Sequence, residues 1–133
     1  MFLARMIYFS VQNGVGDADI QNILDTARAN NALDNITGAL VYNGKHFLQI
    51  LEGDRAKVTM RFASILKDKR HKDVEIIDFS LINERRFPQW TMQYVGASDL
   101  DQGIVSTYSS GDFNPSTMCS PDGIVDMMWR LAQ

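Results

Sequence analysis

The chain has 133 residues, enough for one domain with one core, and its formal net charge of −3 argues against a general nucleic-acid binder. No apolar run approaches the roughly 18 residues of a membrane span, and the first residues lack the features of a signal peptide. The single cysteine, Cys119, excludes a disulfide framework and suits a reducing cytoplasm. We expect Cys119 to be structurally incidental.

The first third of the chain predicts a central strand followed by a helix. Residues 3–12 carry apolar side chains on both faces of a two-residue period, which is typical of a strand with layers packed on each side. Asp17 is a plausible N-cap for a helix that continues to about Asn31. The helical period directs the Asn31 amide toward the sheet, although a C-cap is the ordinary alternative for an Asn near a helix end.

Residues 36–54 predict a β-hairpin whose second strand is also central. Asn43-Gly44 between two apolar runs is the strongest short hairpin signal. The run 47–53 is apolar on both faces, and Gln49 lies in the middle of one of them. A buried amide without partners costs ~1–3 kcal/mol. Gln49 is therefore either satisfied by neighbouring backbone or water, or kept to contact a polar ligand.

A second helix and two more strands follow. Asp54 caps the helix, and the charged run 68–71 at its end is by itself typical of a solvated face. Residues 74–82 predict the fourth strand. Residues 89–95 predict a fifth strand at an edge, with Trp90 and Met92 on one face, because the preceding proline cannot donate to a ladder.

The element order β-α-β-β-α-β-β predicts an α+β fold, a ferredoxin-like βαββαββ sandwich with a mixed five-stranded sheet. The two helices cover one face of the sheet. Ser120 and Pro121 open a last helix, which we expect to cover the other face together with a shorter helix near residues 100–108. The predicted domains are a core at residues 1–96 and a C-terminal helical cap at 97–133.

Tyr8, Asn31 and Gln49 are predicted to meet between the sheet and the two helices. A phenol and two amides around such a slot suit a flat ring system rich in amide groups. No metal site is expected, because the two histidines have no ligand-type spacing. The chain also lacks a recognisable Ser-His-Asp or Cys-His arrangement and a Gly-rich phosphate loop.

Five motifs in order resemble the BLUF family, the blue-light sensors that use FAD, over about residues 3 to 96. They are Arg-Met-Ile-Tyr8-Phe-Ser, Asn30-Asn31 followed by Asn35-Ile-Thr-Gly38, Phe47-Leu-Gln49-Ile-Leu-Glu-Gly53, Asp68-x-Arg70-His71, and Arg86-Phe-x-x-Trp90-x-Met92. The tail resembles that of short family members, which have a small helical cap and no attached enzyme.

The resemblance implies a role for each matched residue. Tyr8 would donate an electron and a proton to the excited flavin, and Gln49 would bridge Tyr8 and the flavin. Rearrangement of the Gln49 hydrogen bonds would shift the flavin absorbance to the red, and Trp90 and Met92 would pass the signal on. The residues expected to bind FAD are Asn31, Gln49, Asp68, Arg70, His71, Leu24, Arg28 and Ile65.

One position departs from the family pattern. Members often have Arg where this chain has Ser64. The contact to the flavin tail would then fall to Arg61 or Arg28.

The implied function is a blue-light photoreceptor that binds FAD non-covalently and is not an enzyme. It would act in the cytoplasm through a separate effector protein or its own oligomer, without a nucleic-acid or membrane partner. Two alternatives remain open. One is an acylphosphatase-type enzyme, because residues 11–15 resemble its phosphate loop, although Gly16-Asp17 follows where an Arg is needed. The other is a ligand-free interaction domain.

Overall fold

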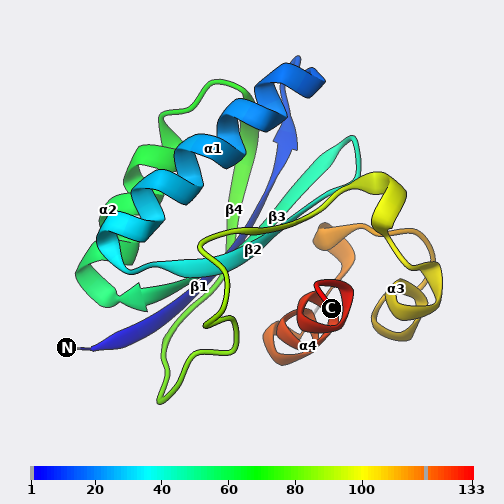
Figure 1. The fold of residues 1–133 in the computed structure, drawn as a ribbon. Helices are drawn as coiled ribbons and strands as arrows, with labels where there is room; N and C mark the ends of the chain where they lie inside the picture. Colours follow the sequence, from blue (N-terminus) through cyan, green and yellow to red (C-terminus); the bar gives the residue numbers. More distant parts are fainter. Residues whose placement is uncertain (1, 119) are drawn as a thin grey trace.

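The computed structural model describes residues 2–118 and 120–133, which fold into one five-stranded sheet between two layers of helices (Figure 1). The prediction for Cys119 concerns a residue outside these ranges. In chain order the elements are β1 (Leu3–Gln12), α1 (Asp17–Asp34), β2 (Thr37–Tyr42), β3 (His46–Asp54), α2 (Arg55–Leu66), β4 (His71–Leu81), β5 (Gln93–Val95), the 3-10 helix η1 (Ala97–Asp99), α3 (Gln102–Tyr108), the 3-10 helix η2 (Pro115–Thr117) and α4 (Pro121–Leu131).

The strand order β4-β1-β3-β2-β5 confirms the predicted mixed sheet. All pairs are antiparallel except β2 with β5, which is parallel. The two strands that are apolar on both faces, β1 and β3, are neighbours in the interior of the sheet, and Tyr8 lies directly opposite Gln49 in their register. This pairing brings together two residues that are far apart in the sequence.

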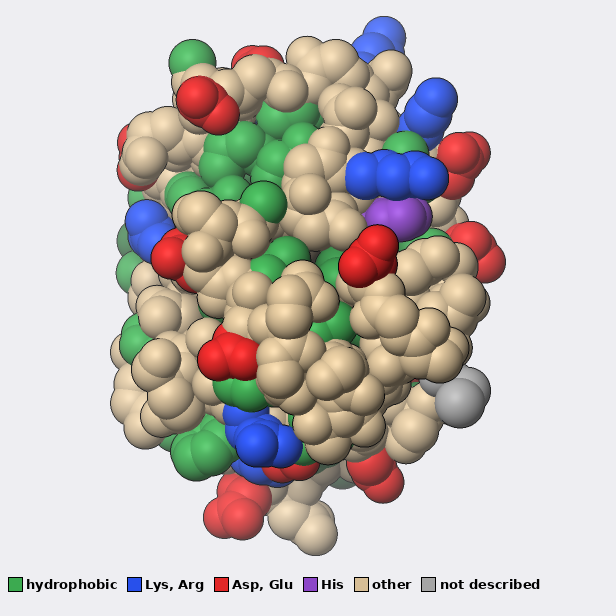
Figure 2. Space-filling model, turned by 90° about the vertical axis from the view of Figure 1, so that its right-hand side faces the viewer, with side chains coloured by type: hydrophobic (Ala, Val, Ile, Leu, Met, Phe, Trp, Pro, Cys, Tyr) green, Lys and Arg blue, Asp and Glu red, His purple; other side chains and the backbone are tan. Residues whose placement is uncertain are grey.

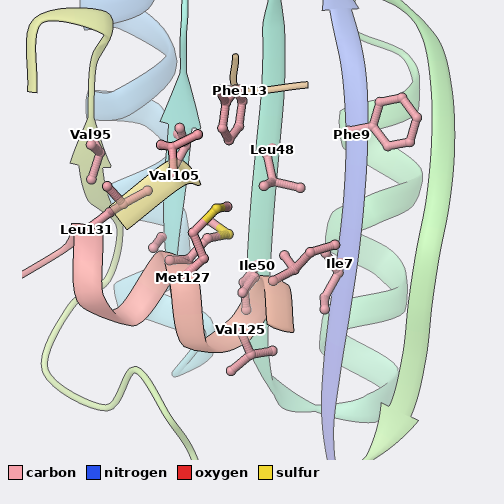
Figure 3. Close-up of a cluster of buried hydrophobic side chains, with 14 of the residues drawn as sticks. Ile7, Phe9, Leu48, Ile50, Val95, Val105, Phe113, Val125, Met127 and Leu131 are labelled. Atoms are coloured by element: carbon pink, nitrogen blue, oxygen red, sulfur yellow. The ribbon is translucent and has the colours of Figure 1, made fainter. Parts of the chain in front are cut away.

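The two faces of the sheet are covered as the sequence predicts. On one face, α1 and α2 pack over a cluster that includes Met6, Phe47 and Leu51. On the other face, α3 and α4 close a larger cluster (Figure 3) of buried side chains from β1, β3 and the C-terminal helices. Ser120 caps α4 by accepting a hydrogen bond from the Gly123 backbone N–H at 3.2 Å.

Helix α1 differs from its prediction at both ends. Gly16 occupies the N-cap, so Asp17 is the first helical residue and not the cap. The helix continues to Asp34 and ends at Asn35, whose φ of 52° is left-handed, as is common after a helix. Asn31 is therefore not a C-cap. It lies in the last turn with its side chain buried toward the sheet.

The predicted strand at 89–95 is wrong in its first half, since β5 contains only Gln93–Val95. Trp90 and Met92 precede the strand and do not share a face. Trp90 packs against the cluster under α4, whereas Met92 belongs to the cluster under α1 and α2. The Trp90 carbonyl accepts from the Gly38 backbone N–H of β2, but the next two carbonyls accept from the side chains of Asn31 and Arg28 in place of a continuous ladder.

The surface and the remaining side chains limit other kinds of site. Within residues 2–118 and 120–133, no helix is long and apolar enough to cross a membrane, and no group of three or more His, Asp or Glu residues could hold a metal ion. On the face shown in Figure 2, Lys and Arg side chains are interspersed with Asp and Glu and do not form a basic stripe.

Candidate functional site

A cavity lies between α1, α2 and the sheet face formed by β1, β3 and β2. Its empty volume is about 850 Å³ when the open solvent at its mouth is included. The walls are largely apolar, and a few amide, hydroxyl and charged groups converge on them. The lining residues are Tyr8, Ile23, Thr26, Ala27, Asn30, Asn31, Leu40, Phe47, Gln49, Leu51, Arg61, Ser64, Ile65, Asp68, Arg70 and His71.

Tyr8 and Gln49 form a buried pair in the floor of the cavity. The Tyr8 hydroxyl donates to Gln49 Oε1, and Gln49 Nε2 lies 3.5 Å from the Met92 sulfur, a weak acceptor. Tyr8 and Gln49 are only 4% and 6% exposed. The amide that the sequence places in a core face is therefore oriented at both ends, by a phenol on one side and a thioether on the other.

The environment keeps the Tyr8 hydroxyl protonated. Burial raises the pKa of Tyr8 well above its usual value, and the nearby Asp68 carboxylate raises this pKa further. Because the phenol holds its proton, it can act as the donor to Gln49. The Phe62 ring, with its centroid 5.3 Å from that of Tyr8, adds to the apolar surroundings.

Asn31 is held at both ends of its amide. Its Nδ2 donates to the Thr91 carbonyl at 2.8 Å, and its Oδ1 accepts from Arg61 Nη1 at 3.1 Å. The Arg61 guanidinium also pairs with Asp34 at the end of α1. Each end of the Asn31 amide retains one further hydrogen-bonding position. Asn31 can therefore contact a ligand while its orientation is fixed by the protein.

Charged side chains line the cavity near the end of α2. Arg70 binds the Asp68 carboxylate through Nε and Nη2, at 3.0 and 2.7 Å, and Arg70 Nη1 donates to Asn22 on α1 at 2.9 Å. The hydrogen bonds from Arg70 lower the pKa of Asp68 despite its partial burial, and the same pairing raises the pKa of Arg70. The pair connects the end of α2 to α1.

His71 links the start of β4 to β1 and α2. Its Nε2 lies 2.8 Å from the Ile65 carbonyl, and its Nδ1 lies 2.7 Å from the Ser10 hydroxyl. A carbonyl can only accept, so Nε2 carries a proton. In the neutral ring Nδ1 then accepts from Ser10, which fixes the tautomer.

Seven of the predicted site residues line this cavity, whereas Leu24, Arg28, Trp90 and Met92 do not. Tyr8, Asn31, Gln49, Ile65, Asp68, Arg70 and His71 come together there. Leu24 is buried in the core beneath α1, where Ile23 takes the lining position, and Arg28 donates to the Met92 carbonyl. Of the two arginines expected to replace the family's Arg at Ser64, Arg61 lines the cavity and Arg28 does not.

Sequence reasoning missed several residues of the site. Thr26, Ala27 and Asn30 line the cavity from α1. The helical period that placed Asn31 includes Ala27, but Asn30 and Thr26 lie about 100° and 140° away from Asn31 around the helix, so the period does not indicate them. Asn22 was missed because its partner Arg70 lies 48 residues away, and no local pattern connects them.

The family model described as sensors of blue light using FAD matches residues 3–93. Among curated proteins, the chain is similar to the blue light- and temperature-regulated antirepressor BluF of Escherichia coli (strain K12), with 32% identity over 92 residues, which are 68% of this chain and 23% of BluF. It is also similar to the photoactivated adenylate cyclase subunit alpha of Euglena gracilis, with 42% identity over 67 residues. That match covers 50% of this chain but 7% of the cyclase subunit, so the chain spans a small part of these relatives.

Solved structures match the whole fold. The structure described as BlrB, a BLUF protein in the dark state, has a TM-score of 0.81 and 32% identity, with 98% of this chain and 94% of that chain covered. The structure described as the photo-activated state of BlsA has a TM-score of 0.86 and 29% identity, with the same coverage. These matches include the C-terminal helices as well as the sheet.

Proposed function

The chain belongs to the BLUF family of blue-light sensors, whose cofactor is FAD, and we propose that Tyr8 and Gln49 are its photochemical switch. The observation that carries this proposal is the hydrogen bond from the Tyr8 hydroxyl to Gln49 Oε1 in the floor of the cavity. The family match also favours a photoreceptor over the acylphosphatase-type enzyme and the ligand-free interaction domain.

The residues of the cavity fit FAD. The apolar walls from α1, α2 and the sheet suit the flat isoalloxazine ring, and the free hydrogen-bonding positions of Asn31 and Gln49 suit its polar edge. Asp68, Arg70 and His71 would lie along the ribityl and phosphate side. Arg61 would replace the cation that the family often has at position 64. FAD binding by Leu24 and Arg28 is not part of this proposal, because neither residue lines the cavity.

The chain's own residues supply the switch. When bound, FAD absorbs blue light and in its excited state accepts an electron and a proton. Tyr8 holds a proton that already points at Gln49 Oε1. The donor and acceptor ends of an amide have nearly the same shape, so Gln49 can exchange them in place. This exchange would replace the contact from Gln49 Nε2 to the Met92 sulfur.

The change at Gln49 must be amplified to control a partner. One rewired hydrogen bond is worth about 1 kcal/mol net, whereas moving an equilibrium from 1:99 to 99:1 needs about 5.5 kcal/mol. Met92 contacts Gln49, and Trp90 packs on the opposite side against the cluster under α4. We infer that movement of the segment between them repacks the C-terminal helices, which supplies the additional free energy.

A second connection reaches α4 from the same strand as Gln49. The Glu52 carboxylate accepts from the Arg86 backbone N–H, and the Arg86 side chain donates to Asp126 of α4 at 2.9 Å and lies over the Trp129 ring. We infer that α3 and α4 form the output surface. It would act on a separate effector protein or on a second copy of this chain, in the cytoplasm and without catalysis by this chain.

The substitution Gln49→Leu tests the proposed switch. Leu has neither donor nor acceptor, so the FAD-loaded variant is expected to bind flavin but to show no light-induced red shift in a difference spectrum. Gln102→Leu, an exposed position in α3, is the matched control and should keep the full red shift. A normal red shift in Gln49→Leu would refute the assignment of Gln49. A wild-type protein that takes up no flavin would refute the photoreceptor function itself.

A further inference from the structure

The segment 90–92 is held by donors that lie outside it. Its three successive carbonyl groups accept hydrogen bonds from the Gly38 backbone N–H at 3.0 Å, from Asn31 Nδ2 at 2.8 Å and from Arg28 Nε at 3.1 Å. The segment precedes β5 and has no strand ladder of its own, so these groups satisfy carbonyls that would otherwise be left to water. Two of the three donors are side chains of α1.

Met92 joins this segment to the proposed switch. Its side chain is 2% exposed, and its sulfur lies 3.5 Å from Gln49 Nε2, while its carbonyl accepts from Arg28. A methionine side chain has three rotatable bonds and its sulfur is a weak acceptor. The contact with Gln49 alone is therefore too weak to fix the position of Met92. Packing in the cluster under α1 and α2 holds its side chain, and the bond from Arg28 holds its backbone.

Arg28 is suited to this role by its position. It is not among the residues that line the cavity, and it lies one helical turn before Asn31, which holds the preceding carbonyl. A guanidinium Nε–H has a direction fixed by the planar group, so its hydrogen bond defines the orientation of the Met92 peptide.

We propose that Arg28 is a positioning residue of the switch, which holds the Met92 carbonyl so that the Met92 sulfur faces Gln49. The proposal rests on the proposed function of Gln49 and adds a residue that acts on it through Met92. It also gives Arg28 a different task from the flavin-tail contact that the sequence predicts.

A double-mutant cycle on the rate of dark recovery tests this role. Arg28→Met removes the donor while Tyr8 and Gln49 remain, so the red shift should persist. The rate of dark recovery should fall about fivefold, the effect of losing one hydrogen bond. The reason is that Gln49 must re-form its contact with the Met92 sulfur while Met92 is no longer held in place. In a Met92→Ala background there is no sulfur to position, so Arg28→Met should change recovery less than about twofold.

The matched control is Arg55→Met, an exposed arginine at the start of α2, which should recover at the wild-type rate. The proposal is overturned if Arg28→Met leaves recovery unchanged. It is equally overturned if Arg28→Met slows recovery by the same factor in the wild-type and Met92→Ala backgrounds. An effect that does not depend on the Met92 side chain cannot come from positioning it.

Nuclear magnetic resonance provides a readout that needs neither flavin photochemistry nor a variant that folds. In the wild-type protein the Arg28 Nε–H should exchange with solvent about tenfold more slowly than that of Arg55, because it is hydrogen-bonded and half-buried. Equal exchange rates would contradict the bond to Met92. If the protein shows no red shift, the proposed function fails, yet the exchange rates still decide whether Arg28 holds Met92.

Discussion

Glu52 gives the sharpest test of how the strand that carries Gln49 is connected to the rest of the molecule. Its side chain is fully buried, and its carboxylate receives Arg5 Nε at 2.8 Å, the Arg86 N–H at 2.9 Å and the Phe87 N–H at 2.7 Å. The Arg5 guanidinium also pairs with it at 2.8 Å. One carboxylate thus binds β1 and the connection that leads to Met92.

The substitution Glu52→Gln keeps the shape but removes one acceptor and the charge. If the remaining oxygen accepts from the two backbone N–H groups, the new NH2 group faces the Arg5 guanidinium. Arg5, whose side chain is 16% exposed, then loses its ion-pair partner. If the amide turns over, the two backbone donors lose theirs. Removing one partner of a buried ion pair typically costs about 3–5 kcal/mol, and we expect a loss of this size in the free energy of unfolding.

Urea unfolding monitored by circular dichroism measures this loss. The control is Glu75→Gln, an exposed position in β4, which should stay within about 0.5 kcal/mol of the wild-type protein. A loss below about 1 kcal/mol in Glu52→Gln would show that the buried carboxylate is not what holds the connection at residues 86–87.

Two further predictions concern the sheet and the charged pair of the cavity. In Gly38→Ala an ideal Cβ would lie 1.9 Å from the Ile50 carbonyl oxygen, so β2 and β3 would have to separate. We expect urea unfolding to show that the free energy of unfolding falls by more than about 4 kcal/mol. The control Gly53→Ala should lose less, because the atom nearest to its Cβ is a side-chain carbon at 3.2 Å. The hydrogen bonds from Arg70 lower the pKa of Asp68 in the folded protein. The Asp68 carboxylate therefore contributes its full stabilisation above the unfolded-state pKa of about 3.9, and this stabilisation is lost as the pH falls through the lowered pKa of the folded state. In urea titrations, the free energy of unfolding of the wild-type protein should exceed that of Asp68→Asn by a constant amount from about pH 7 to 5, and by less below about pH 4. A difference that grows on acidification would contradict the ion pair.

The sequence by itself determined the features that depend on neighbouring residues. The apolar period of two predicted both central strands, Asn43-Gly44 predicted the hairpin between β2 and β3, and Ser120 predicted the start of α4. These patterns act within a few residues, where backbone geometry and capping dominate, so the order of elements and the faces of the sheet follow from them.

Only the tertiary structure decided how the segment before β5 runs. Trp90 and Met92 lie on opposite sides because three carbonyls of this segment bind Gly38, Asn31 and Arg28, which are more than fifty residues away in the sequence. No local period encodes partners at such a separation. For the same reason Arg28, an unremarkable cation on a helix, could be assigned to Met92 only once α1 and this segment were seen in contact.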